Sequence, residues 1–132
     1  MIVLDTSALV EFLVGSDALA ERARSVTVGE RLVAPYGVDL ECASTLRGLT
    51  RGGKLPGDEA LRALDLLGRM NLRRYAHVPL LPRIWELRHN IWPYDASYVA
   101  LAESLGADLV TADKKLIGAP GLRCRIRSLH DA

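Results

Sequence analysis

Short apolar runs and amphipathic stretches alternate along the 132-residue chain. A short apolar run bounded by turn residues is typical of a buried strand, whereas apolar residues at i, i+3, i+4 and i+7 indicate a helix. The apolar runs predict strands at residues 2–4, 32–34, 75–78, 109–111 and 124–127. The helical spacing predicts helices at 16–26, 38–51 and 80–91, and further helices that begin after residue 5, near Pro56 and at Asp95.

This alternation predicts an α/β sandwich around a mainly parallel sheet. No repeat or long linker divides the sequence, so we expect residues 1–132 to form a single domain. Hydrophobic residues make up 49% and charged residues 25% of the chain, as in an ordinary globular protein. No apolar stretch approaches the roughly 20 residues of a membrane helix, and no signal peptide is recognisable. We therefore expect a cytoplasmic protein.

Net charge gives little information about partners. The formal charge is +1, from 17 basic and 16 acidic residues, which does not predict a strongly basic surface for nucleic acid. A near-neutral total is still compatible with a local cluster of carboxylates, which would repel RNA unless cations neutralised it. The positions of the acids are therefore more informative than their number.

Four acids occupy positions where ligands collect in such a fold, at the carboxyl ends of strands and the starts of the following helices. Asp5 follows the first strand, and Asp113 follows the strand that contains Thr111. Asp95 opens one helix and Glu41 lies near the start of another. Converging carboxylates repel one another unless a divalent cation binds between them, and all-oxygen ligands suit Mg²⁺ or Mn²⁺.

Each acid also has a purely structural interpretation. Asp95 fits a helix N-cap, Asp113 fits a turn, and Glu41 alone fits a solvated helix surface. Asp5 is harder to explain in this way, because it directly follows a buried run and unpaired buried carboxylates are rare. The hypothesis of a metal site therefore depends on the four acids lying together.

The order of these motifs resembles the PIN-domain family, and within it the VapC-type toxins of type II toxin–antitoxin systems. Residues 3–9 resemble the opening strand of the family with its first acid, and residues 39–43 resemble its second motif. The most specific part runs over 85–116, where Tyr-Asp-Ala at 94–96 precedes a helix and Thr-Ala-Asp at 111–113 follows the next strand. The resemblance covers essentially the whole chain.

The resemblance implies a PIN-domain-like three-layer α/β/α sandwich and a metal-dependent endoribonuclease that leaves a 5′-phosphate and a 3′-hydroxyl. It implies that four residues carry out catalysis and bind one or two Mg²⁺ or Mn²⁺ ions: Asp5, Glu41, Asp95 and Asp113. Three residues with hydroxyl groups would orient the carboxylates or bound waters: Thr6, Ser7 and Thr111. Basic residues near the acids are candidates for contacts with RNA phosphates: Arg47, Arg51, Lys114 and Lys115.

VapC-type proteins generally form homodimers whose activity is blocked by a cognate antitoxin. The resemblance therefore implies three partners, namely a second copy, an antitoxin and an RNA substrate. Alternatives remain open: a PIN-fold RNA-processing nuclease outside a toxin–antitoxin system, or a non-catalytic RNA- or protein-binding module. A phosphoaspartyl hydrolase is a further alternative, although Ser7 stands where such enzymes usually carry a second acid.

Overall fold

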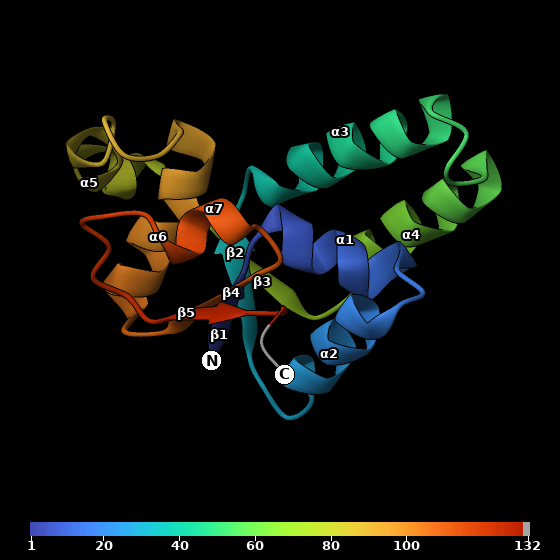
Figure 1. Ribbon diagram of the computed structural model, residues 1–132, viewed down its shortest axis with the longest axis horizontal. Helices are drawn as coiled ribbons and strands as arrows, with labels where there is room; N and C mark the ends of the chain where they lie inside the picture. Colours follow the sequence, from blue (N-terminus) through green and yellow to red (C-terminus); the bar gives the residue numbers. More distant parts are fainter. Residues whose placement is uncertain (131–132) are drawn as a thin grey trace.

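Five parallel strands form the centre of the computed structural model, which describes residues 1–130 (Figure 1). Their order in the sheet is β3-β2-β1-β4-β5, and each neighbouring pair is parallel. The mainly parallel sheet predicted from the sequence is therefore confirmed. The strands are β1 (Ile2–Leu4), β2 (Leu32–Pro35), β3 (Leu72–Tyr75), β4 (Asp108–Thr111) and β5 (Ile126–Ser128).

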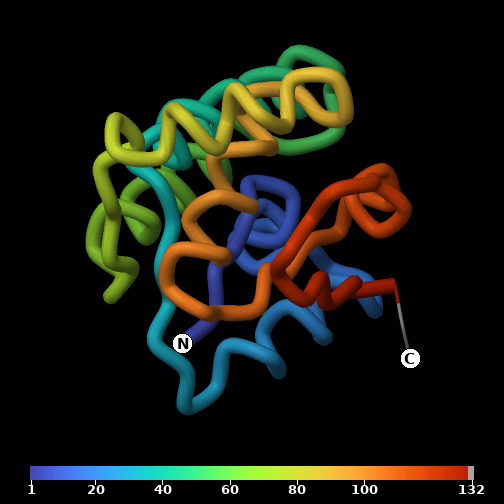
Figure 2. Tube along the Cα trace, turned by 90° about the vertical axis from the view of Figure 1, so that its left-hand side faces the viewer, coloured from blue at the N-terminus to red at the C-terminus, as the bar shows by residue number. Residues whose placement is uncertain are grey.

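Helices cover both faces of this sheet and so give the predicted three layers. Figure 1 shows α1, α2 and α4 on one side of the strands and α5 and α6 on the other. Figure 2, turned by 90°, shows the α5 segment crossing over the start of α6. The helices are α1 (Thr6–Val14), α2 (Ala18–Thr27), α3 (Val38–Arg51), α4 (Gly57–Arg69), the 3-10 helix η1 (Val78–Leu80), α5 (Leu81–Glu86), α6 (Pro93–Leu105) and α7 (Lys114–Ile117).

The main core lies between the sheet and the helices α1 and α6. Val3 of β1, Leu109 of β4 and Leu9 of α1 are completely buried. Helix α6 packs on β1, β2 and β4, and it ends at Gly106, whose left-handed backbone (φ 63°) suits glycine. Burial of these aliphatic side chains supplies most of the stabilisation of the fold.

A smaller core joins α3 to α4. Helix α4 contributes the buried Ala60 and Ala63 to it, while its buried Leu67 belongs to the main core. Leu46 of α3 packs against this face. The hairpin of α3 and α4 therefore extends from the sheet as a helical pair with its own apolar contacts (Figure 1).

The predicted strand at 75–78 was wrong in position, because β3 spans Leu72–Tyr75 and η1 follows it. The apolar pattern misplaced the strand since Arg74 lies within it. The Arg74 guanidinium donates hydrogen bonds to the Asp39 carboxylate at 2.7 to 3.2 Å and to the Leu67 carbonyl at 2.9 Å. A fully paired charge is thus accommodated in a strand at the edge of the sheet.

The predicted helix at 80–91 is also shorter than expected, since α5 ends at Glu86 and residues 87–90 form turns. Trp92 precedes Pro93 and has an extended backbone (φ −65°, ψ 151°). A residue before proline disfavours the helical conformation, so α5 cannot run on into α6. Over residues 1–130, the structure contains no helix with the length and apolar character that a membrane span requires.

Candidate active site

A cavity of about 640 Å³ lies where the carboxyl ends of the strands meet the following helices. All four predicted acids line it: Asp5, Glu41, Asp95 and Asp113. Asp5 follows β1 and Asp113 follows β4, while Glu41 and Asp95 lie in the first turns of α3 and α6. The parallel topology therefore brings together acids that are far apart in the sequence.

Asp5 is almost fully buried and caps the N-terminus of α1. Its Oδ1 accepts hydrogen bonds from Ser7 Oγ at 2.7 Å and from the Ala8 amide at 2.9 Å. Its Oδ2 accepts one from Thr111 Oγ1. The same side chain thus caps a helix and lines the cavity, so its structural role does not exclude a functional one.

Ser7 and Thr111 connect Asp5 to the loop that carries Asp113. Thr111 Oγ1 accepts a hydrogen bond from the Asp113 amide at 2.9 Å and lies 3.2 Å from Ser7 Oγ. Ser7 Oγ in turn accepts one from the Ala112 amide at 2.9 Å. The structure therefore places these two predicted supporting residues in one hydrogen-bonded unit with two of the acids.

Glu41 is held by two hydroxyl groups on the other side of the cavity. Tyr98 Oη donates to Glu41 Oε2 at 3.2 Å, and Thr6 Oγ1 lies 2.8 Å from Tyr98 Oη and 3.4 Å from Glu41 Oε1. Tyr98 was not among the residues predicted for the site. Tyr98 lies three residues after Asp95 on α6, and this spacing places both side chains on the same face of the helix. It was the signal in the sequence that could have identified Tyr98.

Asp113 combines a structural and a site position, as Asp5 does. It is the N-cap of α7, and its Oδ1 accepts a hydrogen bond from the Lys115 amide at 2.9 Å. Asp95 is not the N-cap of α6, a position that Trp92 occupies, but lies in the first turn. The interpretation of Asp95 as an N-cap is therefore wrong. The interpretation of Asp113 as a turn residue is compatible with its position in the cavity lining.

Burial and mutual repulsion raise the pKa values of three of these acids. Burial raises the pKa of Asp5 to about 6, against the hydrogen bonds that it accepts, and Asp95 adds to the increase. Burial likewise raises the pKa of Glu41, with contributions from Asp95 and Asp5. Burial and the charge of Asp113 raise the pKa of Asp95, which Lys115 opposes. Ionising these acids together in the cation-free protein therefore costs free energy.

The donor atoms of the cavity fit a hard divalent cation. Its acids supply only oxygen ligands, which suits Mg²⁺ or Mn²⁺ better than zinc. Within residues 1–130, no three His, Cys, Asp or Glu side chains are gathered tightly enough to hold one ion by themselves. Mg²⁺ usually keeps several waters and contacts one or two carboxylates, so the arrangement suits a cation that is bound partly through water.

The four predicted RNA-binding residues lie outside the lining of the cavity. Lys114 and Lys115 begin α7 directly after Asp113, and both are exposed. Arg47 and Arg51 are exposed on α3, beyond the turn that carries Glu41. Aromatic side chains that sequence analysis did not assign to the site, Trp92 and Tyr94, line the cavity instead.

The raised pKa of Asp5 predicts that its carboxylate destabilises the cation-free protein at neutral pH. An acid whose folded-state pKa exceeds its unfolded value of 3.8 favours folding at low pH, and this stabilisation is lost as the pH rises through about 6. Asp5→Asn removes the titration, and an amide can still accept from Ser7 and Ala8. In EDTA, we expect the variant to gain up to about 3 kcal/mol over the wild type between pH 4 and pH 7.

Denaturant unfolding at pH 4, 5, 6 and 7 measures this difference. A difference in the free energy of unfolding that stays constant over this range would show that Asp5 is ionised as freely in the folded state as in the unfolded state.

Together, the parallel fold and the carboxylate-lined cavity define an α/β protein with an acidic site of the kind that binds divalent cations. The PIN domain family model matches residues 2–122. Ribonuclease VapC9 of Mycobacterium tuberculosis is 44% identical over 126 residues, which cover 96% of each chain. The chain belongs to the PIN-domain family, in its VapC-type branch.

Solved structures show the same fold at low sequence identity. Mycobacterium tuberculosis VapC20, described as a Sarcin-Ricin loop cleaving toxin, superposes with a TM-score of 0.67 at 19% identity, over 93% of this chain and 99% of that one. A chain of a toxin–antitoxin complex from Klebsiella pneumoniae gives a TM-score of 0.66 at 16% identity over the full length of both chains. At these identities, the two similarities establish the fold alone.

Proposed function

We propose that this chain is a metal-dependent endoribonuclease and the toxin of a VapBC-type toxin–antitoxin pair. The observation that carries the proposal is the convergence of four carboxylates on one cavity at the carboxyl edge of the sheet. The 44% identity to a VapC ribonuclease over nearly the whole chain supports it. Residues 1–132 would form a single nuclease domain that acts in the cytoplasm, where its RNA substrate is found.

The four carboxylates would hold one or two Mg²⁺ or Mn²⁺ ions: Asp5, Glu41, Asp95 and Asp113. Such an ion lowers the pKa of a bound water and neutralises negative charge on the phosphate. Hydrogen bonds from Ser7 and Thr111 orient the Asp5 oxygens, and those from Tyr98 and Thr6 orient Glu41. The proton that Asp5 keeps up to about pH 6 competes with a cation for the same oxygens, so binding weakens in acid.

RNA and an antitoxin are the proposed partners, together with a second copy in a homodimer. Lys114 and Lys115 lie next to Asp113 and would contact RNA phosphates, with Arg47 and Arg51 as further contacts along α3. The family provides the support for an antitoxin, since the Klebsiella protein of the same fold was solved as a toxin–antitoxin complex.

Incubation of purified, antitoxin-free protein with total cellular RNA tests the proposed function. We expect discrete cuts in Mg²⁺ or Mn²⁺, none in EDTA, and ends that carry a 5′-phosphate and a 3′-hydroxyl. Sequencing of the cut ends identifies the substrate. Folded protein that binds the cation yet cuts no RNA would overturn the proposal in favour of a binding module.

Cation binding should also stabilise the protein, independently of any cleavage. A cation that neutralises the converging carboxylates binds the folded state, and at about 100 times its Kd it adds about 2.7 kcal/mol to the free energy of unfolding. We expect Mg²⁺ to raise the Tm of the wild type, and to raise that of Glu41→Gln much less. Thermal unfolding with Mg²⁺ and with EDTA, at constant ionic strength, measures both. Equal increases in the two proteins would place the cation elsewhere.

A further inference from the structure

A second cavity of about 440 Å³ borders the acidic one and contains both tryptophans of the chain. Trp85, at the end of α5, is 67% exposed, and Trp92, before α6, is 75% exposed. Trp92 lines both cavities, so the two lie side by side. Large aromatic side chains exposed to this extent beside a candidate active site indicate a contact surface.

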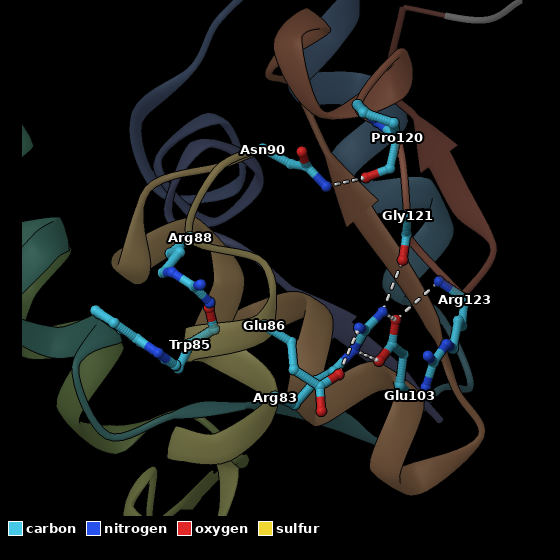
Figure 3. A network of polar contacts seen from close by, with 9 residues as sticks. All are labelled: Arg83, Trp85, Glu86, Arg88, Asn90, Glu103, Pro120, Gly121 and Arg123. Carbon is cyan, nitrogen blue, oxygen red and sulfur yellow. Dashed lines mark hydrogen bonds and ion pairs between the residues drawn. The ribbon is translucent and has the colours of Figure 1, made fainter.

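Arg88 stacks on one of these tryptophans. Its guanidinium carbon lies 4.6 Å from the centre of the Trp85 ring, and its Nη1 donates to the Trp85 carbonyl at 2.9 Å (Figure 3). This contact holds the guanidinium beside the indole and keeps both accessible on the surface. We name Trp85, Arg88 and Trp92 the aromatic platform.

A network of polar contacts fixes the segment that carries the aromatic platform. Arg83 Nε donates to Glu103 Oε1 of α6 at 2.7 Å, and its Nη2 donates to the Gly121 carbonyl at 2.7 Å (Figure 3). Asn90 Nδ2 donates to the Pro120 carbonyl at 3.0 Å. These bonds tie the turns after α5 to α6 and to the loop before β5. The segment that carries Trp85 and Arg88 is therefore fixed before any ligand binds.

The charges of the two cavities are opposite. The acidic cavity is lined by four carboxylates, and no Lys or Arg of the described residues lines it. The second cavity contains Arg88 and His89, and none of the described acids lines it. An RNA strand whose scissile phosphate lies in the acidic cavity must gain its affinity from neighbouring surfaces. The aromatic platform is such a surface, because it offers tryptophan rings for base stacking and a guanidinium for a phosphate.

We propose that the aromatic platform binds an unpaired nucleobase of the RNA substrate next to the scissile phosphate. This rests on the proposed nuclease function. Bases stack on tryptophan rings in single-stranded RNA recognition, and Arg contributes both stacking and a contact to phosphate. Because Trp92 also lines the acidic cavity, a strand whose phosphate lies there passes the aromatic platform, and this favours RNA as its occupant. The proposal therefore requires a base that is unpaired next to the cut.

Tryptophan fluorescence tests the proposal directly, because both tryptophans belong to the aromatic platform. The full-length Asp5→Asn variant, which should not cleave, is titrated in Mg²⁺ with a short single-stranded RNA. We expect saturable quenching by this RNA, and much weaker quenching by the same strand in a duplex or with abasic sites. Equal quenching by all three RNAs, or none by any, would overturn the proposal. Fluorescence that instead changes with protein concentration alone would identify the surface as an interface between copies.

Kinetics with matched variants give a second test. Trp85→Leu and Trp92→Leu keep an apolar side chain but lose the ring, so KM for single-stranded RNA should rise at least about 5-fold. For Trp85→Leu, which lies outside the acidic cavity, kcat should change little. Trp85→Phe, which keeps a ring, should restore most of the affinity, and Arg62→Ala on α4 is a surface control. An unchanged KM in both leucine variants would overturn the proposal that the aromatic platform binds a base, and it would leave the proposed nuclease function unaffected. Quenching without any cleavage by the wild type would instead overturn the nuclease.

Discussion

Asp5→Asn should abolish RNA cleavage, with a fall in kcat/KM of at least about 100-fold, since even residues that only support a metal ligand cost about 10- to 100-fold. Asp5 is the most buried of the four acids, and both of its oxygens are oriented by hydrogen bonds. An asparagine keeps the shape and the helix cap but loses the negative charge. Initial rates on a defined RNA in saturating Mg²⁺ measure the effect.

Asp17→Asn is the matched control for this experiment. Asp17 caps α2 as Asp5 caps α1, and its side chain accepts hydrogen bonds from the Leu19 and Ala20 amides. It lies outside the acidic cavity, so the same chemical change should leave cleavage near the wild-type rate. Wild-type cleavage by Asp5→Asn would remove Asp5 from the reaction.

Thr111→Val has the second large expected effect, and it acts on both stability and activity. The substitution keeps the shape of a completely buried side chain but removes the hydroxyl that donates to Asp5 and accepts from the Asp113 amide. Leaving buried polar groups without a partner costs about 1–3 kcal/mol, so the free energy of unfolding should fall by that amount. Cleavage should fall by about 10- to 100-fold, because the Asp5 carboxylate is no longer oriented.

Thr111→Ser separates the hydroxyl from the methyl group. The serine keeps the hydrogen bonds and loses only a buried methyl, so it should recover most of the cleavage rate while remaining somewhat less stable than the wild type. If Thr111→Val cleaved as fast as the wild type, the hydrogen bond to Asp5 would have no part in catalysis.

The opposite effects expected for Asp5→Asn on stability and on activity have a single cause. In the cation-free protein, the buried carboxylate raises the energy of the folded state, and the same burial places it where a cation can be held. Active sites commonly combine function with a local loss of stability in this way. The variant should therefore be both more stable in EDTA at neutral pH and inactive in Mg²⁺.

The sequence was sufficient to predict the parallel sheet and the convergence of the acids. Both depend on short apolar runs followed by an acid, as at Asp5 and Asp113, and on the rule that parallel strands end at one edge. Elements whose stability comes from specific polar contacts were not predictable. Arg74 in β3 is an example, because the strand accommodates its charge through hydrogen bonds to Asp39 and to the Leu67 carbonyl.

The candidate site was predictable in its acids and less so in its surroundings. Tyr98 of α6 was not predicted as a site residue, although its buried side chain donates a hydrogen bond to Glu41 of α3. Trp92 has no periodic apolar pattern that would assign it to the cavity. A one-dimensional pattern shows which face a residue occupies, whereas contacts between helices distant in sequence appear only in three dimensions.

The dependence of the cleavage rate on Mg²⁺ concentration shows whether these carboxylates form a catalytic cation site. We expect the wild type to have no activity in EDTA and its rate to rise with Mg²⁺ to a plateau. Asp113→Asn, which keeps the cap of α7, should need a much higher Mg²⁺ concentration for half of its own maximal rate. Cleavage that proceeds equally well in EDTA, or the same Mg²⁺ dependence in both proteins, would contradict a cation site formed by these carboxylates.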